Sequence, residues 1–194
     1  AAKNTISGQL GQINLAVPHY ESGISAMEAV LAFTFVSSGT DDPVVVSRVR
    51  LSFLDLDEGA DGWQRECIGV RGHSSYTSAS STELVETVDP SGGGFTTFCS
   101  SQEGTATDNP TDPLALTPLQ QARTFEFELL EVSSVDVRLV IDCCAWVSTG
   151  RNFQFAGSTN VIPVCVPEPP LPPPSPPPPP VPSPPPPPPL PPFP

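Results

Sequence analysis

The sequence predicts an all-β protein, with a β-sandwich or jelly-roll-like domain over residues 1–165 and a polyproline II rod over residues 166–194. Short segments of the body alternate between apolar and polar residues with a period of two. Clusters of Gly, Ser, Asp and Pro separate these segments at turn-like intervals, and no 3.6-residue helical pattern is present. Finally, 21 of the last 29 residues are proline. Together these features favour two packed β-sheets followed by a stiff extended tail.

The body contains roughly ten short segments with strand character. The clearest begins at Thr124, where Phe125, Phe127 and Leu129 alternate with polar residues. The expected strands are Ile13–Val17, Ala29–Val36, Val44–Leu56, Glu66–Val70, Thr82–Val88, Phe95–Cys99, Thr124–Glu131, Ser134–Val147, Phe153–Phe155 and Asn160–Val166. Residues 1–12 are polar and are expected to add an edge strand, either to the chain's own sheet or to the sheet of a neighbouring copy.

One short helix is expected between the strands. Thr117, Pro118 and Gln120 form a capping box with proline at the first helical position, which predicts a helix over Pro118–Arg123. We interpret this helix as a connector because it lies between a proline-rich turn and a strand.

The tail can adopt only an extended conformation. Each proline ring restricts φ to about −65° and removes a backbone donor, so neither a helix nor a sheet can form. A polyproline II helix of this length would extend roughly 90 Å. Such rods serve as stalks, spacers and matrix components, so the tail favours a structural protein over an enzyme.

The charge of the chain excludes some classes of partner. Lysine and arginine number 8 against 21 acidic residues, which gives a formal net charge of −13. Nucleic acid and anionic lipids are poor partners for such a surface. No apolar run is long enough to cross a bilayer, so we expect no membrane insertion. We interpret Ala1-Ala2-Lys3 as the mature end left by signal-peptide cleavage, and thus expect a secreted protein.

The five cysteines indicate an oxidising compartment. They lack the spacing of a zinc site and fit two disulfides, formed by Cys67, Cys99, Cys144 and Cys165, plus one odd thiol. Cys67 and Cys99 flank one loop-rich region, and Cys165 could reach either Cys143 or Cys144. Strand alternation directs Cys143 toward the core, so we favour a Cys144–Cys165 disulfide with Cys143 buried and free.

An acidic loop follows one predicted strand and is a candidate calcium site. Asp55, Asp57 and Asp61 lie among glycines that permit sharp turns, and their oxygens could surround a hard cation. The spacing resembles the start of an EF-hand loop but lacks the third acid and the distal glutamate. A second acidic turn (Asp108, Asn109 and Asp112) could close the same site, and a solvated turn is the alternative.

Support for catalysis is weak. The two histidines, His19 and His73, lie in no recognisable motif, and a disulfide explains Cys99 better than a nucleophile pair with His73. We interpret Glu126 and Glu128, which point to one face of a strand, as solvated. We therefore expect no enzymatic activity. Four aromatic residues could form a carbohydrate platform, although core packing is the alternative: Trp63, Tyr76, Phe95 and Trp146.

Residues 166–194 resemble the Ser-Pro modules of hydroxyproline-rich glycoproteins, since Ser175 and Ser183 each precede a run of prolines (SPPPPPVP and SPPPPPPL). These proteins include plant extensins and the pherophorin-type cell-wall and ciliary-surface proteins of green algae, whose layout of a globular domain with a proline rod is similar. The resemblance implies O-linked arabinose- or galactose-rich chains on hydroxyproline and some serines. The modified positions would be Ser175, Pro176, Pro177, Pro178, Pro179, Ser183, Pro184, Pro185, Pro186 and Pro187.

The function expected from these features is that of a secreted structural glycoprotein, a subunit of an extracellular fibre, sheath or cell wall. Its partners would be further copies of itself, in a homopolymeric filament, and extracellular glycans. The tail, the N-terminal segment or both would join the copies. The alternatives are a carbohydrate-binding module tethered by a proline-rich stalk and a hydrolase whose catalytic residues form no known motif.

Overall fold

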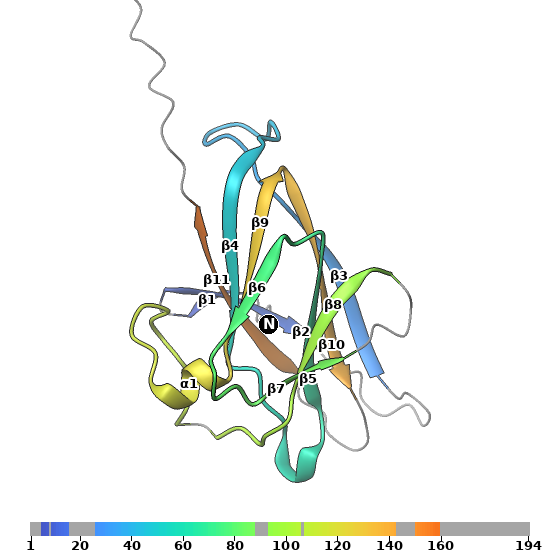
Figure 1. Ribbon diagram of the computed structural model, residues 1–194, viewed down its shortest axis with the longest axis vertical. Helices are drawn as coiled ribbons and strands as arrows, with labels where there is room; N and C mark the ends of the chain where they lie inside the picture. The colour runs from blue at the N-terminus through green and yellow to red at the C-terminus, as the bar shows by residue number, and fades with distance from the viewer. Residues whose placement is uncertain are drawn as a thin grey trace, which may run out of the picture. The chain divides into compact units, whose positions relative to one another are not determined.

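The computed structural model describes residues 5–7, 9–15, 26–87, 93–105, 107–142 and 150–159. All of them belong to the compact unit Ala1–Val161. The described residues form two antiparallel sheets with almost no helix, which confirms the all-β class (Figure 1). The predicted domain boundary at residue 165, the strand predicted over Asn160–Val166 and the proline tail lie outside the described residues.

The two sheets have six and five strands, and every strand pairing within them is antiparallel. The six-stranded sheet has the order β1 (Thr5–Ser7), β2 (Leu10–Leu15), β11 (Arg151–Thr159), β4 (Val46–Leu54), β9 (Phe125–Val132) and β6 (Ser75–Ser78). The five-stranded sheet has the order β3 (Ala26–Thr34), β10 (Ser134–Asp142), β5 (Arg65–Arg71), β8 (Phe95–Ser100) and β7 (Leu84–Thr87).

Strand alternation builds one hydrophobic core from both sheets. In β9, Phe125, Phe127 and Leu129 are buried and the intervening glutamates are partly exposed, as the sequence predicts. The inward residues of β10 and β5 complete the core from the other sheet, for example Leu139 and Val70, each 0% exposed. The position of each side chain thus follows from the period of two along its strand.

The outer face of the six-stranded sheet carries charged cross-strand neighbours. Arg50 Nε lies 3.5 Å from Glu128 Oε2, and Ser52 Oγ donates a hydrogen bond of 3.1 Å to Glu126. Their side chains are partly exposed to solvent. This agrees with the interpretation of Glu126 and Glu128 as a solvated pair.

The short helix α1 (Pro118–Ala122) has the predicted capping box. Thr117 Oγ1 accepts a hydrogen bond from Gln120 N (3.3 Å), and Thr117 N donates one to Gln120 Oε1 (2.9 Å). The residue after the helix, Arg123, is its C-cap and is 5% exposed. The helix is therefore more than a connector, because it delivers a buried cation to the site described below.

Some elements differ from the expected ones. Strand β11 has nine residues, although only Phe153–Phe155 was expected. Its second half, Ala156–Thr159, pairs with β4 but has no apolar alternation by which the sequence could indicate a strand. Strand β6 was not expected, since its four residues are all exposed and mainly hydroxylic. Strand β1 pairs with β2 of the same chain. Strand β10 ends at Asp142, and residues 143–147 of the longer predicted strand lie outside the described part.

Cys67 of β5 and Cys99 of β8 are directly opposite each other and form a disulfide. Both are buried, at 3% exposure. The favoured partners Cys144 and Cys165, and Cys143, lie outside the described residues. In the part of the chain that the structure describes, no helix is long and apolar enough to cross a membrane.

Candidate functional site

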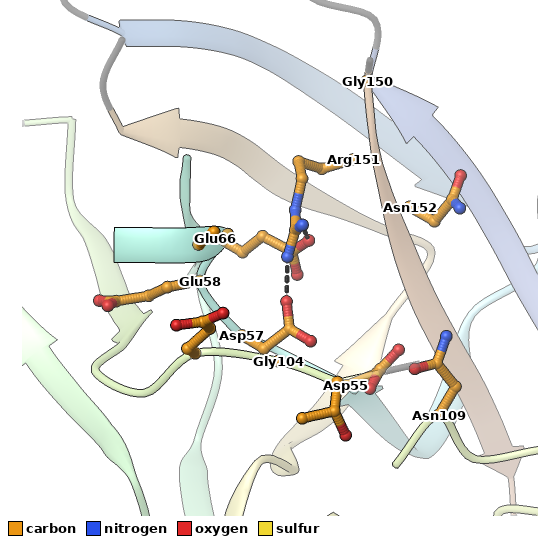
Figure 2. Close-up of a pocket in the computed structure, with 13 residues that line it drawn as sticks. Asp55, Asp57, Glu58, Glu66, Gly104, Asn109, Gly150, Arg151 and Asn152 are labelled. Carbon is orange, nitrogen blue, oxygen red and sulfur yellow. Dashed lines mark hydrogen bonds and ion pairs between the residues drawn. The ribbon is translucent and has the colours of Figure 1, made fainter. Parts of the chain in front are cut away.

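A polar pocket of about 420 Å³ lies beyond the end of β4 (Figure 2). Segments far apart in the sequence line it: the loop after β4, the start of β5, the long connection after β8 and the start of β11. The lining residues are Asp55, Asp57, Glu58, Gly59, Ala60, Glu66, Glu103, Gly104, Thr105, Asn109, Gly150, Arg151 and Asn152.

The loop after β4 brings Asp55 and Asp57 to the pocket. Asp55 has φ of 62°, in the left-handed region that aspartate tolerates better than most residues, and the chain turns there. Leu56 is buried, and its N–H donates a hydrogen bond of 3.2 Å to Arg123 O. Asp57 O accepts hydrogen bonds from Ser100 Oγ (2.9 Å) and Glu66 N (3.3 Å). The loop is therefore anchored to β5 and β8 of the five-stranded sheet and to Arg123, and the two aspartates, two residues apart, both reach the pocket.

A third aspartate, Asp108, comes from the connection between β8 and α1. Both of its carboxylate oxygens accept a hydrogen bond from Thr105 N at 3.1 Å. Its carboxylate also pairs with Arg123, with 2.5 Å between Nη1 and Oδ2. Gln120 Nε2 of α1 donates to Asp108 O at 2.9 Å. The helix therefore holds both members of this buried ion pair.

Arg123 has two further partners. Its Nε lies 2.8 Å from Glu83 Oε2, and its Nη2 donates a hydrogen bond of 3.0 Å to Glu103 O. Three groups thus accept hydrogen bonds from one buried guanidinium, which fixes its orientation.

The second guanidinium of the site belongs to Arg151, the first residue of β11. Its Nε lies 2.6 Å from Glu66 Oε1, and its Nη2 pairs with Asp57 Oδ1. Figure 2 shows Arg151 entering the pocket between these two carboxylates, with Asp55 and Asn109 beyond the Asp57–Arg151 pair. Glu66 is 2% exposed and Asp57 is 7% exposed, so Arg151 compensates two buried charges.

Gly104 allows the connection after β8 to approach the aspartate. A Cβ atom at this position would lie 1.6 Å from Asp57 Oδ2, well inside the van der Waals limit. Gly104 N donates a hydrogen bond of 2.9 Å to Glu58 O, which fixes the close approach. Glycine is therefore required here for the Asp57 carboxylate to keep its position.

The electrostatics of the site raise the pKa of three of its acids, Asp55, Asp57 and Glu66. Burial raises the pKa of Asp55 to about 7, and the neighbouring carboxylates Asp57 and Asp108 add to the effect. Burial also raises the pKa of Asp57, although Arg151 opposes the shift. The pKa of Glu66 is raised well above its usual range, again mainly by burial. The pocket thus holds more negative charge than its surroundings stabilise.

These shifts predict a pH dependence of stability in chelator-containing buffer. Folded Asp55 keeps its proton up to about pH 7, whereas the unfolded chain loses it near about pH 4. The folded state binds more protons between these values, so the free energy of unfolding should fall as pH rises through this window, by up to about 4 kcal/mol. Urea denaturation at several pH values measures this.

The matched variant is Asp55→Asn, which cannot titrate at this position. Between about pH 4.5 and about pH 7.5, roughly the ends of this window, the free energy of unfolding should fall more for the wild type than for the variant. A difference that is independent of pH would contradict the raised pKa of Asp55.

The structure brings together some of the predicted ligands and separates others. One ligand atom from each of Asp55, Asp57 and Asp108 can be chosen so that all three lie within 4.8 Å of one another. Asp61 is not in this group. It is exposed, with φ of 61°, in the 3-10 turn η1 (Ala60–Gly62). Asp112 accepts a hydrogen bond from Leu114 N (2.9 Å) in an exposed turn.

Sequence reasoning missed three residues of the site, namely Glu66, Arg123 and Arg151. A signal was available for Glu66, because it shares a strand face with Ile68 and Val70, both of which are core residues. A glutamate on an inward face must find a buried partner. No comparable signal exists for the two arginines, since each lies at the boundary of an element.

The other candidate residues do not form a second site with these. His73 packs 5.1 Å from the Phe127 ring, between ring centroids. Cys99 is in the disulfide, so it is no nucleophile for His73. Trp63 and Tyr76 are 45% and 44% exposed on different elements, and neither lines the pocket. Further candidates lie outside the described residues: His19, Trp146, Ser175, Ser183 and the tail prolines.

The lining side chains that can act chemically are carboxylates, two amides, a threonine and a guanidinium. Oxygen donors of this kind suit a hard cation, and they suit zinc or copper poorly. Similarity to known proteins gives no further guidance, because no family model, curated protein or solved structure matches this chain.

Proposed function

We propose that this chain is a secreted structural glycoprotein, a subunit of an extracellular fibre, sheath or cell wall. It would combine a β-sandwich body with a glycosylated polyproline II stalk, and it would have no catalytic role. The abrupt change in composition at residue 166, to 21 prolines in 29 residues interrupted by Ser175 and Ser183, carries this proposal. A segment of this composition does not form a packed core, and it is suited to be a stiff extended spacer.

The body has features that suit such a role. Its two sheets share a core rich in phenylalanine, and a disulfide joins β5 to β8. Several strand pairs carry cross-strand ion pairs, as between Arg138 and Glu28, where Nη2 and Oε2 are 2.6 Å apart. The acidic surface, with a net charge of −13, disfavours nucleic acid and anionic membranes as partners. The proposed location is an extracellular matrix, a cell wall or a ciliary surface.

The proposed partner is a further copy of the same chain. A rod of roughly 90 Å is longer than the width of a body of this size, roughly 30–40 Å, so it would extend past its own domain. The rod contains apolar residues that could dock in grooves of successive copies: Leu171, Val181, Leu190 and Phe193. Because β1 pairs with β2 of the same chain, the tail is the stronger candidate for the bridging segment. Contacts that do not close into a ring would produce a filament.

Mass spectrometry of residues 166–194 from the native source tests this proposal. We expect hydroxyproline with pentose or hexose additions, centred on the runs that follow Ser175 and Ser183, and no glycan on asparagine. Sedimentation gives a second test. The intact chain should sediment as polymers, and a separately produced chain shortened after Val166 should sediment as monomers.

Each measurement has an outcome that contradicts part of the proposal. An unmodified tail would remove the hydroxyproline-rich glycoprotein assignment. Polymers that form equally well without residues 167–194 would exclude assembly through the tail and leave the N-terminal segment. Binding of the shortened chain to a glycan array would favour the carbohydrate-binding alternative.

A further inference from the structure

The buried carboxylates at and beside the pocket beyond β4 carry a surplus of negative charge that the arginines paired with them do not neutralise. Four buried carboxylates (Asp55, Asp57, Glu66 and Asp108) have exposures of 9% or less. The guanidinium groups of Arg123 and Arg151 are the cations that pair with them, in the part of the chain that the structure describes. Four carboxylates and two guanidinium groups leave a surplus of two negative charges. Glu83, which also pairs with Arg123, is not counted and would only add to the surplus.

The surplus is concentrated at Asp55. Arg123 pairs with Asp108, and Arg151 pairs with Asp57 and Glu66, whereas the described residues offer no ion pair to Asp55. Asp55 Oδ1 is buried and has no hydrogen-bond partner among the described residues, and the side chain lines the pocket. A buried carboxylate oxygen with no donor is costly unless something binds it. This observation points to a missing positive group at this position.

The neighbouring oxygens are arranged to share such a group. Asp55, Asp57 and Asp108 can each offer an oxygen within 4.8 Å of the other two. Glu66 Oε2 is also buried and has no hydrogen-bond partner in the described part of the chain, and Asn109 lines the same pocket with a side chain that contains a carbonyl oxygen. The carboxylates come from two separate segments, and hydrogen bonds within the protein hold both. Ser100 Oγ of β8 donates to Asp57 O, and Thr105 N donates to the Asp108 carboxylate, so the arrangement does not depend on a ligand to form.

We propose that Asp55 and Asp57, which line this pocket, and the adjacent Asp108 together bind one Ca²⁺ ion. A divalent ion matches the surplus of two negative charges, and an all-oxygen donor set selects a hard cation. The site is irregular in shape and about 420 Å³ in volume, so it leaves room for water to complete a coordination number of six to eight. Mg²⁺ demands a regular octahedron with shorter bonds and fits such a site less well. The proposal concerns the two-sheet body and does not depend on the role of the tail.

The test uses the full chain after removal of metal by a chelator. Isothermal titration at pH 7.5 with CaCl₂ should show one site per chain. CaCl₂ should also raise the Tm by several degrees, and MgCl₂ at the same concentration should raise it less. Asp55→Asn is the informative variant because Asp55 has no ion-pair partner among the described residues that the change would leave unpaired. It should weaken Ca²⁺ binding at least tenfold while the far-UV circular dichroism is retained.

Asp61→Asn is the matched control, since Asp61 has the same charge, lies in the same loop and is exposed outside the three-carboxylate group. Its Ca²⁺ affinity should stay within twofold of wild type. Weak extracellular calcium sites have a Kd of up to about 1 mM. The proposal is overturned if CaCl₂ at about tenfold this concentration leaves the wild-type Tm unchanged. A Ca²⁺ response that Asp55→Asn retains, or that Asp61→Asn loses instead, would overturn the site. Equal stabilisation by Mg²⁺ would overturn the assignment to calcium.

Discussion

Replacing Arg123 by methionine is expected to lower the free energy of unfolding by about 3–5 kcal/mol. Arg123 is 5% exposed, and its guanidinium pairs with Asp108 and Glu83 and donates to Glu103 O. Methionine can fill much of the space but offers no donor. The variant would therefore leave the buried Asp108 carboxylate without its cation, beside two other buried aspartates. Urea denaturation followed by circular dichroism measures the loss.

Arg50→Met is the matched control. Arg50 also pairs with two carboxylates, at 3.5 and 3.8 Å, but its side chain is 52% exposed on the outer face of the six-stranded sheet. Solvent screens these contacts, so the loss should be below about 1 kcal/mol. Similar losses in the two variants would mean that burial does not set the strength of the Arg123 network.

The double variant Arg123→Met, Asp108→Asn separates loss of the cation from loss of packing. If the uncompensated Asp108 charge causes the instability, removal of that charge should restore part of the lost stability, and the two substitutions should be non-additive. Additive losses would assign the effect of Arg123→Met to packing alone.

The elements of the fold that follow from local sequence were predictable. In β9, Phe125, Phe127 and Leu129 identify the inward face directly, because a strand exposes alternate residues to alternate sides. The helix over Pro118–Ala122 was equally predictable, since Thr117 and Gln120 cap it through bonds made within four residues. Such signals need no knowledge of the tertiary fold.

The acidic site was predictable only in part. Asp55 and Asp57 are close in the chain and were expected to act together, and the turn containing Asp108 was an expected contributor. Asp61 seemed equivalent by spacing, but it adopts a left-handed φ of 61° in η1 and is exposed to solvent. Backbone conformation within a glycine-containing loop decides such a case, and composition alone does not specify that conformation.

The cations of the site could not be predicted because they come from distant segments. Arg151 reaches Asp57 and Glu66 across 94 and 85 residues of sequence, through the pairing of β11 with β4. Arg123 reaches Asp108 because α1 lies between them: Gln120 of this helix donates a hydrogen bond to Asp108 O, and Arg123 is the C-cap of the helix. Which strands become neighbours is a property of the whole topology, so an isolated arginine at an element boundary carries no local signal of its partner.

Phe127→Ala is expected to be the most damaging single change in the core, with a loss of about 3–5 kcal/mol. Phe127 is 0% exposed, and its ring centroid lies 4.6 Å from Phe125 and 6.2 Å from Phe98. Phe125 lies on the same strand, whereas Phe98 belongs to the opposite sheet. Alanine would leave a cavity where the two sheets meet, and packed neighbours can collapse into it only partly.

Thermal and urea denaturation check this prediction against two further variants. Val45→Ala also shortens an apolar side chain to alanine, but Val45 is 65% exposed, so this change should alter stability by less than about 0.5 kcal/mol. Phe127→Leu keeps most of the buried volume but removes the edge-to-face contacts with Phe53 and Phe125, so its loss should lie between the other two. If Phe127→Ala proves no more damaging than Phe127→Leu, the cavity is not the source of the cost. The contacts between aromatic rings, rather than the filling of space between the sheets, would then hold the two-sheet body together.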